Sequence, residues 1–165
     1  EQGTAMHLVM QYLPFDTPAN SNAVARQVHM LQERRLLTGE QAASIRCDRI
    51  AAFLQSEFCS RIRTADRVWR EYRFALLVEA ALYDPAAAGE EMMLQGVADV
   101  CFETAEGLVI ADFKTDRLAA GEALQRAQRY RPQLEAYSRA LSRVLEKPVV
   151  EKVLYFFSTG ETIGL

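Results

Sequence analysis

The alternation of hydrophobic and polar residues is most informative in the middle of the chain. Residues 94–103 and 108–114 are rich in Val, Ile, Leu and Phe, as is typical of strands. The four residues between them end in glycine, which favours a short connection. The sequence therefore predicts a β-hairpin, and pairing Glu103 with Leu108 sets its register.

In this register Asp99 lies opposite Asp112. Side chains alternate along a strand, so Asp112 and Lys114 share one face and Phe113 points to the other. The second strand is apolar on both faces, which is typical of a buried strand, and carboxylates buried there need a partner or a metal ion. Two close carboxylates and an amine favour metal-dependent cleavage of a phosphodiester. The alternative is an exposed hairpin with solvated charges.

Helical periodicity accounts for much of the remaining chain. It predicts a first helix with Thr4 as its N-cap and a third helix opened by a capping box at Thr38 and Gln41. Pro132 is expected to start a second segment within the last helical region. The predicted helices are 4–13, 23–37, 40–57 and 121–146, the further strands are 67–79 and 149–158, and 84–89 is a loop. This order predicts a mixed α/β domain with helices flanking a central mixed sheet.

Composition and charge exclude only a few classes of protein. The chain has 165 residues, half of them hydrophobic, and a net charge of −3, so we expect a single domain without strong non-specific affinity for nucleic acid. We see neither a secretory signal nor an apolar run approaching the ~20 residues that span a bilayer, so no membrane partner is expected. The first residue is Glu1, which suggests a piece of a longer protein.

The cysteines predict a structural role in a reduced, cytoplasmic compartment. Cys47, Cys59 and Cys101 form no CxxC motif and are too few to hold a four-cysteine iron–sulfur cluster within this chain. They are expected to be small core residues.

Several other residues have two readings. His7 stands among apolar residues, where a lone histidine is usually a core residue, but with an acid pair elsewhere in the chain it becomes a candidate third ligand for Mg²⁺ or Mn²⁺. Gln133 and Tyr137 share a helix face and either support a site or are a surface amide and a half-buried tyrosine. Glu71 and Glu79 lie on the strand 67–79, and spacing does not tell which of them, if either, approaches the acid pair.

Arginines form two groups in the chain, and their role depends on where they lie. If they flank the acid pair they make a local track for phosphates, and otherwise they are solvated surface charges. The sequence lacks the GxxxxGK[ST], GxSxG and HExxH motifs. The two groups are Arg117, Arg126, Arg129 and Arg131, and Arg61, Arg63, Arg67, Arg70 and Arg73.

Four motifs occur in an order and spacing that resemble a known family. They are Gly-Thr-Ala-Met-His at 3–7, Gln-Gly-Val-Ala-Asp at 95–99, Asp-Phe-Lys-Thr-Asp at 112–116 and Gln-Leu-Glu-Ala-Tyr at 133–137. This pattern resembles the RecB-type nucleases of the PD-(D/E)XK superfamily, most closely the C-terminal nuclease domains of AddA-type helicase–nuclease subunits. Ala98 stands where the superfamily has proline before its aspartate, a departure common in this branch.

The resemblance implies a restriction-endonuclease-like core and a role for each motif. His7, Asp99, Asp112 and the backbone carbonyl of Phe113 would bind Mg²⁺, with Mn²⁺ as the alternative ion. Asp99, Asp112 and Lys114 would be the catalytic residues. Those expected to support the site or contact DNA are Gln133, Tyr137, Arg117 and Tyr130.

The resemblance also implies a biological setting. Residues 1–165 would form one nuclease domain at the C-terminus of a larger chain whose helicase part supplies single-stranded DNA. An AddB-type subunit would be the partner, and double-strand-break processing and recombinational repair, in the cytoplasm at the nucleoid, would be the task. The alternatives are a stand-alone RecB-like exonuclease and a non-catalytic DNA-binding module on the same fold.

Overall fold

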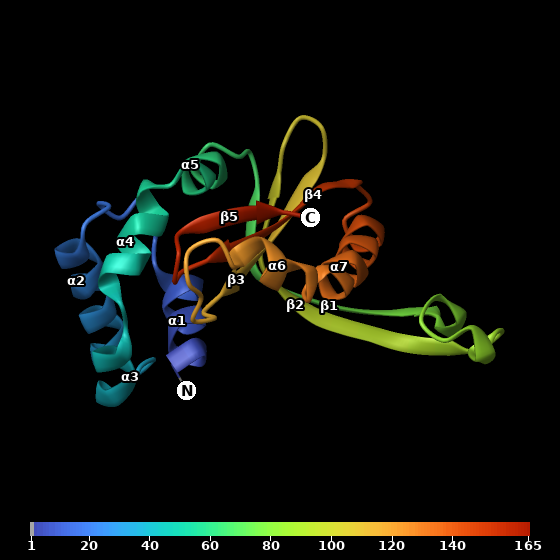
Figure 1. Ribbon diagram of the computed structural model, residues 1–165, viewed down its shortest axis with the longest axis horizontal. Helices are drawn as coiled ribbons and strands as arrows, with labels where there is room; N and C mark the ends of the chain where they lie inside the picture. Colours follow the sequence, from blue (N-terminus) through green and yellow to red (C-terminus); the bar gives the residue numbers. More distant parts are fainter. Residues whose placement is uncertain (1) are drawn as a thin grey trace.

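A five-stranded mixed sheet forms the centre of the computed structural model, which describes residues 2–165 (Figure 1). Its strands follow the chain in the order β1-β2-β3-β4-β5, and only β3 and β4 run parallel. This arrangement confirms the predicted α/β class with a mixed sheet. The strands are β1 (Val68–Glu79), β2 (Glu91–Glu103), β3 (Leu108–Lys114), β4 (Val149–Phe156) and β5 (Glu161–Gly164).

Helices cover both faces of the sheet, and each face has its own hydrophobic core. On one side lie α1 (Gln2–Tyr12), α2 (Ser21–Glu33), α3 (Gly39–Ser44), α4 (Cys47–Gln55) and α5 (Glu57–Arg63). On the other lie α6 (Ala123–Gln128) and α7 (Arg131–Val144), as Figure 1 shows. β3 is buried along almost its whole length because it is the central strand between these two layers.

The predicted hairpin and its register are confirmed. Four pairs join β2 to β3, from Glu103–Leu108 to Val100–Ala111. Beyond the last pair, the Phe113 amide on β3 donates its hydrogen bond to a side chain of β2, Asp99 Oδ2 at 2.6 Å, and not to the β2 backbone.

The β1–β2 hairpin extends well beyond the rest of the sheet as an arm (Figure 1). Two short 3₁₀ helices, η1 (Ala80–Leu82) and η2 (Pro85–Ala87), form its tip, so the predicted loop at 84–89 is partly helical. Asp84 caps η2 by accepting a hydrogen bond from the Ala86 amide at 3.0 Å.

Several predicted boundaries are wrong. The first helix begins before Thr4, which is therefore not its N-cap, and α2 ends four residues before the predicted boundary at 37. The capping box at Thr38 is confirmed, but the expected helix 40–57 is interrupted at Ile45 and again at Ser56, whose backbones are extended. The strand at 149–158 is also not the last one, because β5 follows it.

The expectation for Pro132 is confirmed, and that for the cysteines is confirmed for two of the three. Pro132 lies in the first turn of α7, as expected for the start of a second segment. Cys59 and Cys101 are buried core residues, whereas Cys47 is only partly buried. In the described part of the chain, every helix is too short or too polar to cross a membrane.

Candidate active site

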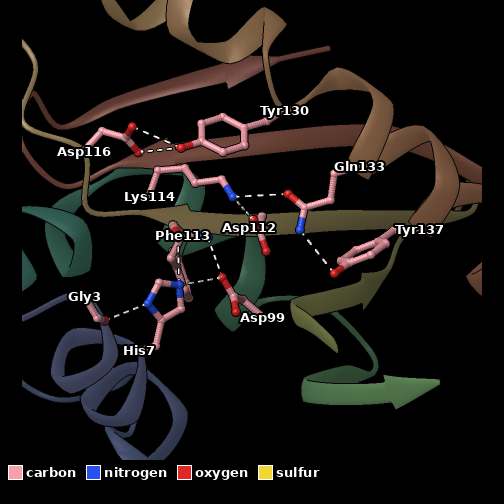
Figure 2. A network of polar contacts seen from close by, with 10 residues as sticks. All are labelled: Gly3, His7, Asp99, Asp112, Phe113, Lys114, Asp116, Tyr130, Gln133 and Tyr137. Atoms are coloured by element: carbon pink, nitrogen blue, oxygen red, sulfur yellow. Dashed lines mark hydrogen bonds and ion pairs between the residues drawn. The ribbon is translucent and has the colours of Figure 1, made fainter. Parts of the chain in front are cut away.

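Three separate segments bring the predicted site residues together (Figure 2). α1 contributes His7, β2 contributes Asp99, and the end of β3 contributes Asp112 and Lys114. Asp112 and Lys114 form an ion pair on one face of β3, while Phe113 packs into the core on the opposite face. The alternation predicted for these three residues is therefore confirmed, and the charges converge at the end of β3.

Both ring nitrogens of His7 face oxygen atoms. Nδ1 donates a hydrogen bond to the Gly3 carbonyl and Nε2 donates one to the Phe113 carbonyl, each at 2.9 Å. Nε2 also lies 3.3 Å from Asp99 Oδ2. The hydrogen bond with Asp99 is the main reason that the pKa of His7 is raised to about 9, so the ring is an imidazolium in this arrangement.

Asp112 is a buried carboxylate that lies close to a second carboxylate, that of Asp99. Only 6% of the residue is exposed. Burial raises its pKa to about 6, and the charge of Asp99 adds to this. The nearby Lys114 ammonium acts in the opposite direction but does not compensate fully. A further positive charge beside Asp112 would therefore be strongly favoured.

The ammonium group of Lys114 is held from three sides. It pairs with Asp112, donates a hydrogen bond to Gln133 Oε1 at 3.4 Å, and lies 3.8 Å from the centre of the Tyr130 ring. The Tyr130 hydroxyl in turn donates to the Asp116 carboxylate at 3.0 Å (Figure 2). The ring face attracts a cation, so Tyr130 and Gln133 fix where the amine points.

Gln133 is positioned by Tyr137, one turn later on α7. Its amide donates to the Tyr137 hydroxyl at 3.2 Å, which leaves its oxygen directed at Lys114. The Tyr137 ring packs edge-on against Phe74, with ring centres 5.1 Å apart. Both rings pass over Gly96, where an added Cβ would lie 2.7 Å from each of them. Glycine is needed here because the backbone of β2 approaches the two rings so closely.

Of the two acids on β1, the structure places Glu71 beside the site. Its neighbours Arg70 and Tyr72 pair with Val100 and Ala98, so Glu71 lies opposite Asp99. Its φ of +48° is rare for a residue with a side chain. Burial and the charge of Asp99 raise the pKa of Glu71. Glu79, by contrast, is exposed at the far end of the strand.

Most of the predicted arginine track is engaged elsewhere. Arg126 pairs with Asp116 at 2.7 Å, Arg61 pairs with Glu151 at 2.7 Å, and Arg70 stacks on the Phe15 ring at 4.0 Å. Arg117 is exposed and lines a pocket beside the site. Arg46 and Arg49 line the same pocket, and sequence reasoning missed them.

The donor set suits a hard divalent cation. Carboxylate oxygens, a backbone carbonyl and an imidazole nitrogen are ligands that Mg²⁺ and Mn²⁺ accept. The Gly3 carbonyl holds Nδ1 in the protonated form, which leaves Nε2 as the nitrogen for a metal. Among residues 2–165, no three His, Cys, Asp or Glu side chains are already arranged as a metal site. Instead, Asp112 forms an ion pair with Lys114, and Nε2 of His7 carries a proton. Binding would therefore displace these internal partners.

Comparisons with known proteins agree with this geometry. The family model described as the PD-(D/E)XK nuclease superfamily matches residues 1–163. An ATP-dependent helicase/nuclease subunit of Bacillus velezensis is 36% identical over 174 residues, covering 100% of this chain and 14% of that subunit. The corresponding subunit of Bacillus licheniformis is 35% identical over 173 residues, covering 99% of this chain and 14% of the subunit.

A third relative extends the likeness to another genus. The corresponding subunit of Ruminiclostridium cellulolyticum is 37% identical over 170 residues, which cover 100% of this chain and 13% of the subunit. The chain thus spans about one seventh of these curated relatives and corresponds to their C-terminal part. Nucleases of this family generally use divalent metal ions. With the family model covering nearly its whole length, this chain belongs to the PD-(D/E)XK nuclease superfamily.

Proposed function

We propose that this chain hydrolyses phosphodiester bonds of single-stranded DNA with Mg²⁺, or Mn²⁺ in its place. The observation that carries the proposal is the convergence of His7 from α1 with Asp99, Asp112 and Lys114 from the β2–β3 hairpin. Two largely buried carboxylates beside an imidazole are costly for a structural site and useful for a metal site.

The ligands would be His7, Asp99, Asp112 and the Phe113 carbonyl. When bound, the metal would polarise the scissile phosphate and lower the pKa of its water. Asp99 would keep its bond from the Phe113 amide, which fixes the carboxylate against the strand end. His7 would give up the proton on Nε2 and keep the one on Nδ1, which the Gly3 carbonyl accepts.

Lys114 would stabilise the negative charge that develops on the phosphate. Its ammonium now pairs with Asp112, and neutralising Asp112 with a metal would free it to face the substrate. Gln133 and Tyr130 keep the amine at the site during this exchange. Tyr137 acts through Gln133, so it is a positioning residue.

The relatives support a wider role. They are named as helicase/nuclease subunits, and this chain corresponds to a small C-terminal part of them. We propose that residues 1–165 are the nuclease domain of such a protein and receive a single strand from its helicase part. An AddB-type subunit would complete the assembly, and processing of broken DNA at the nucleoid would be its task.

Cleavage of an end-labelled single-stranded oligonucleotide tests the core of the proposal. We expect the chain to cut the oligonucleotide with Mg²⁺ or Mn²⁺ and to be inert in EDTA. Asp112→Asn removes one ligand charge at nearly constant shape and should abolish cutting. Asp16→Asn, on an exposed loop residue, is the matched control and should cut normally.

The outcomes separate the alternatives. Equal cutting by Asp112→Asn and Asp16→Asn would contradict the assignment of the site. DNA binding without cutting, in a protein that also fails to bind Mn²⁺ in calorimetry, would instead support a non-catalytic binding module. Preference for a free end over a circular strand would indicate an exonuclease.

A further inference from the structure

We infer that a pocket beside the candidate active site binds a backbone phosphate of the single-stranded DNA. This phosphate would be the neighbour, on the same strand, of the phosphate that is cleaved. The pocket has a volume of about 270 Å³. It is lined by Met6, Arg46, Arg49, Thr115, Arg117 and Phe157. The inference rests on the proposed function for the identity of the strand, and it adds the residues that hold it.

The pocket is built from the same segments as the candidate active site. Met6 directly precedes His7 on α1, and Thr115 directly follows Lys114 at the end of β3. α1 can approach Thr115 because Gly3 has no side chain, since a Cβ there would lie only 3.0 Å from Thr115 Oγ1. A strand whose scissile phosphate lies at Asp112 therefore has this pocket immediately beside its path.

The charge of the pocket is positive, although the chain as a whole carries −3. None of the described residues that line it is acidic. Arg46 is partly neutralised, because it forms a bidentate ion pair with Asp48 at 2.8 and 3.0 Å. The side chains of Arg49 and Arg117 have no ion-pair partner among residues 2–165, so two guanidinium groups remain for a ligand.

Arginine pairs of this kind suit phosphate in particular. The planar guanidinium donates two parallel hydrogen bonds to phosphate oxygens, and the Thr115 hydroxyl supplies a further donor. Met6 and Phe157 are buried at 4% and 3% exposure, so the apolar side of the pocket excludes water and strengthens these bonds. The acids Asp99 and Asp112 repel an incoming strand, and the neighbouring arginines offset this repulsion.

The test compares the affinity of the purified chain for a fluorescent single-stranded oligonucleotide in EDTA, at several salt concentrations. Arg49→Gln with Arg117→Gln should weaken binding at least tenfold near 0.1 M salt. Each lost phosphate contact should lower the slope of log affinity against log salt by about 0.7. Arg139→Gln removes an exposed arginine from α7, on the other side of the sheet, and should leave both quantities unchanged.

A second variant separates charge from folding. Arg49→Lys with Arg117→Lys keeps both charges and should retain the salt slope, with affinity between those of the wild type and the Gln variant. If the Gln and Arg139→Gln variants bind alike, the pocket assignment is wrong even when metal-dependent cleavage persists. If the Gln variant loses affinity while the wild type never cleaves, the pocket stands and the nuclease proposal fails.

Discussion

Neutralising Asp112 should stabilise the metal-free protein while removing its function. Burial and the charge of Asp99 raise the pKa of Asp112 from 3.8 to about 6 in the folded chain. At about 1.4 kcal/mol per pKa unit, the ionised carboxylate costs roughly 3 kcal/mol of folding stability above neutral pH. The ion pair with Lys114 opposes this cost but is outweighed.

The sign of the pH dependence follows from the raised pKa. The stability that protonated Asp112 contributes is fully present below 3.8, the pKa of Asp112 in the unfolded chain. It is lost as pH rises through about 6, its pKa in the folded chain. Asp112→Asn resembles the protonated state at every pH. In EDTA the variant should therefore melt close to the wild type near pH 4 and roughly 6–12 °C higher at pH 8, given about 2–4 °C per kcal/mol for a chain of this size.

Metal should largely cancel this difference in stability. A ligand at a hundredfold excess over its Kd stabilises a protein by about 2.7 kcal/mol, so Mn²⁺ should raise the melting temperature of the wild type and leave that of Asp112→Asn nearly unchanged. Differential scanning calorimetry at pH 4, 6 and 8, with EDTA or Mn²⁺, measures all of these quantities. A variant that melts below the wild type at pH 8 in EDTA would refute the reasoning, because the Lys114 ion pair would then dominate.

Three further predictions concern other residues in and around the candidate site. Lys114→Met should lower kcat at least a hundredfold while Mn²⁺ affinity in calorimetry stays the same or rises, and lost metal binding would contradict its role. Mn²⁺ affinity should increase from pH 6.5 to 8.5, because His7 must release a proton to bind metal and its pKa is raised to about 9. A Mn²⁺ affinity that does not change with pH would exclude His7 as a ligand. Gly96→Ala would place its Cβ 2.7 Å from the rings of Phe74 and Tyr137. Urea melts should therefore show a loss of about 1–3 kcal/mol in the free energy of unfolding, and cleavage should fall. An unchanged free energy of unfolding would show that the rings move freely.

Local patterns in the sequence were enough for the centre of the fold. The hairpin that carries Asp99 and Asp112 could be placed because a short loop and alternating residues determine its register, and four pairs confirm it. Pro132 likewise marked the start of α7, because proline fits a first helical turn. Both signals act within a few residues, so tertiary packing had little opportunity to override them.

Breaks within helices were harder to foresee. The region 40–57 has continuous helical periodicity, yet Ile45 and Ser56 adopt extended backbones. Ser56 caps α5 by accepting a hydrogen bond from the Cys59 amide at 3.1 Å, and a serine followed by Glu57 was the available signal. β5 escaped notice because it has only four residues and follows a turn at Gly160, where φ is +73°.

The arginine pocket could not be predicted from spacing at all. Arg46 and Arg49 meet Arg117 only because α4 begins beside the segment that follows β3, almost seventy positions later in the chain. The arginines that looked clustered in the sequence, such as Arg61 and Arg126, instead pair with acids that tertiary structure brings to them. Which arginines remain free is therefore decided by long-range contacts.

The position of Glu71 shows how the backbone adds charge to the site. Strand alternation alone cannot favour Glu71 over Glu79, because both have odd positions on β1 and so share a nominal face. The register with β2 places Glu71 opposite Asp99, at a φ of +48° that costs about 1–2 kcal/mol for a residue with a side chain. Three acids, Glu71, Asp99 and Asp112, then lie together. His7, Arg73 and Arg70 act on the charge of Glu71, yet its pKa stays raised, as does that of Asp112 beside Lys114. We therefore propose that the strained backbone of Glu71 and the raised pKa of Asp112 reflect a metal-binding role rather than a contribution to the stability of the fold.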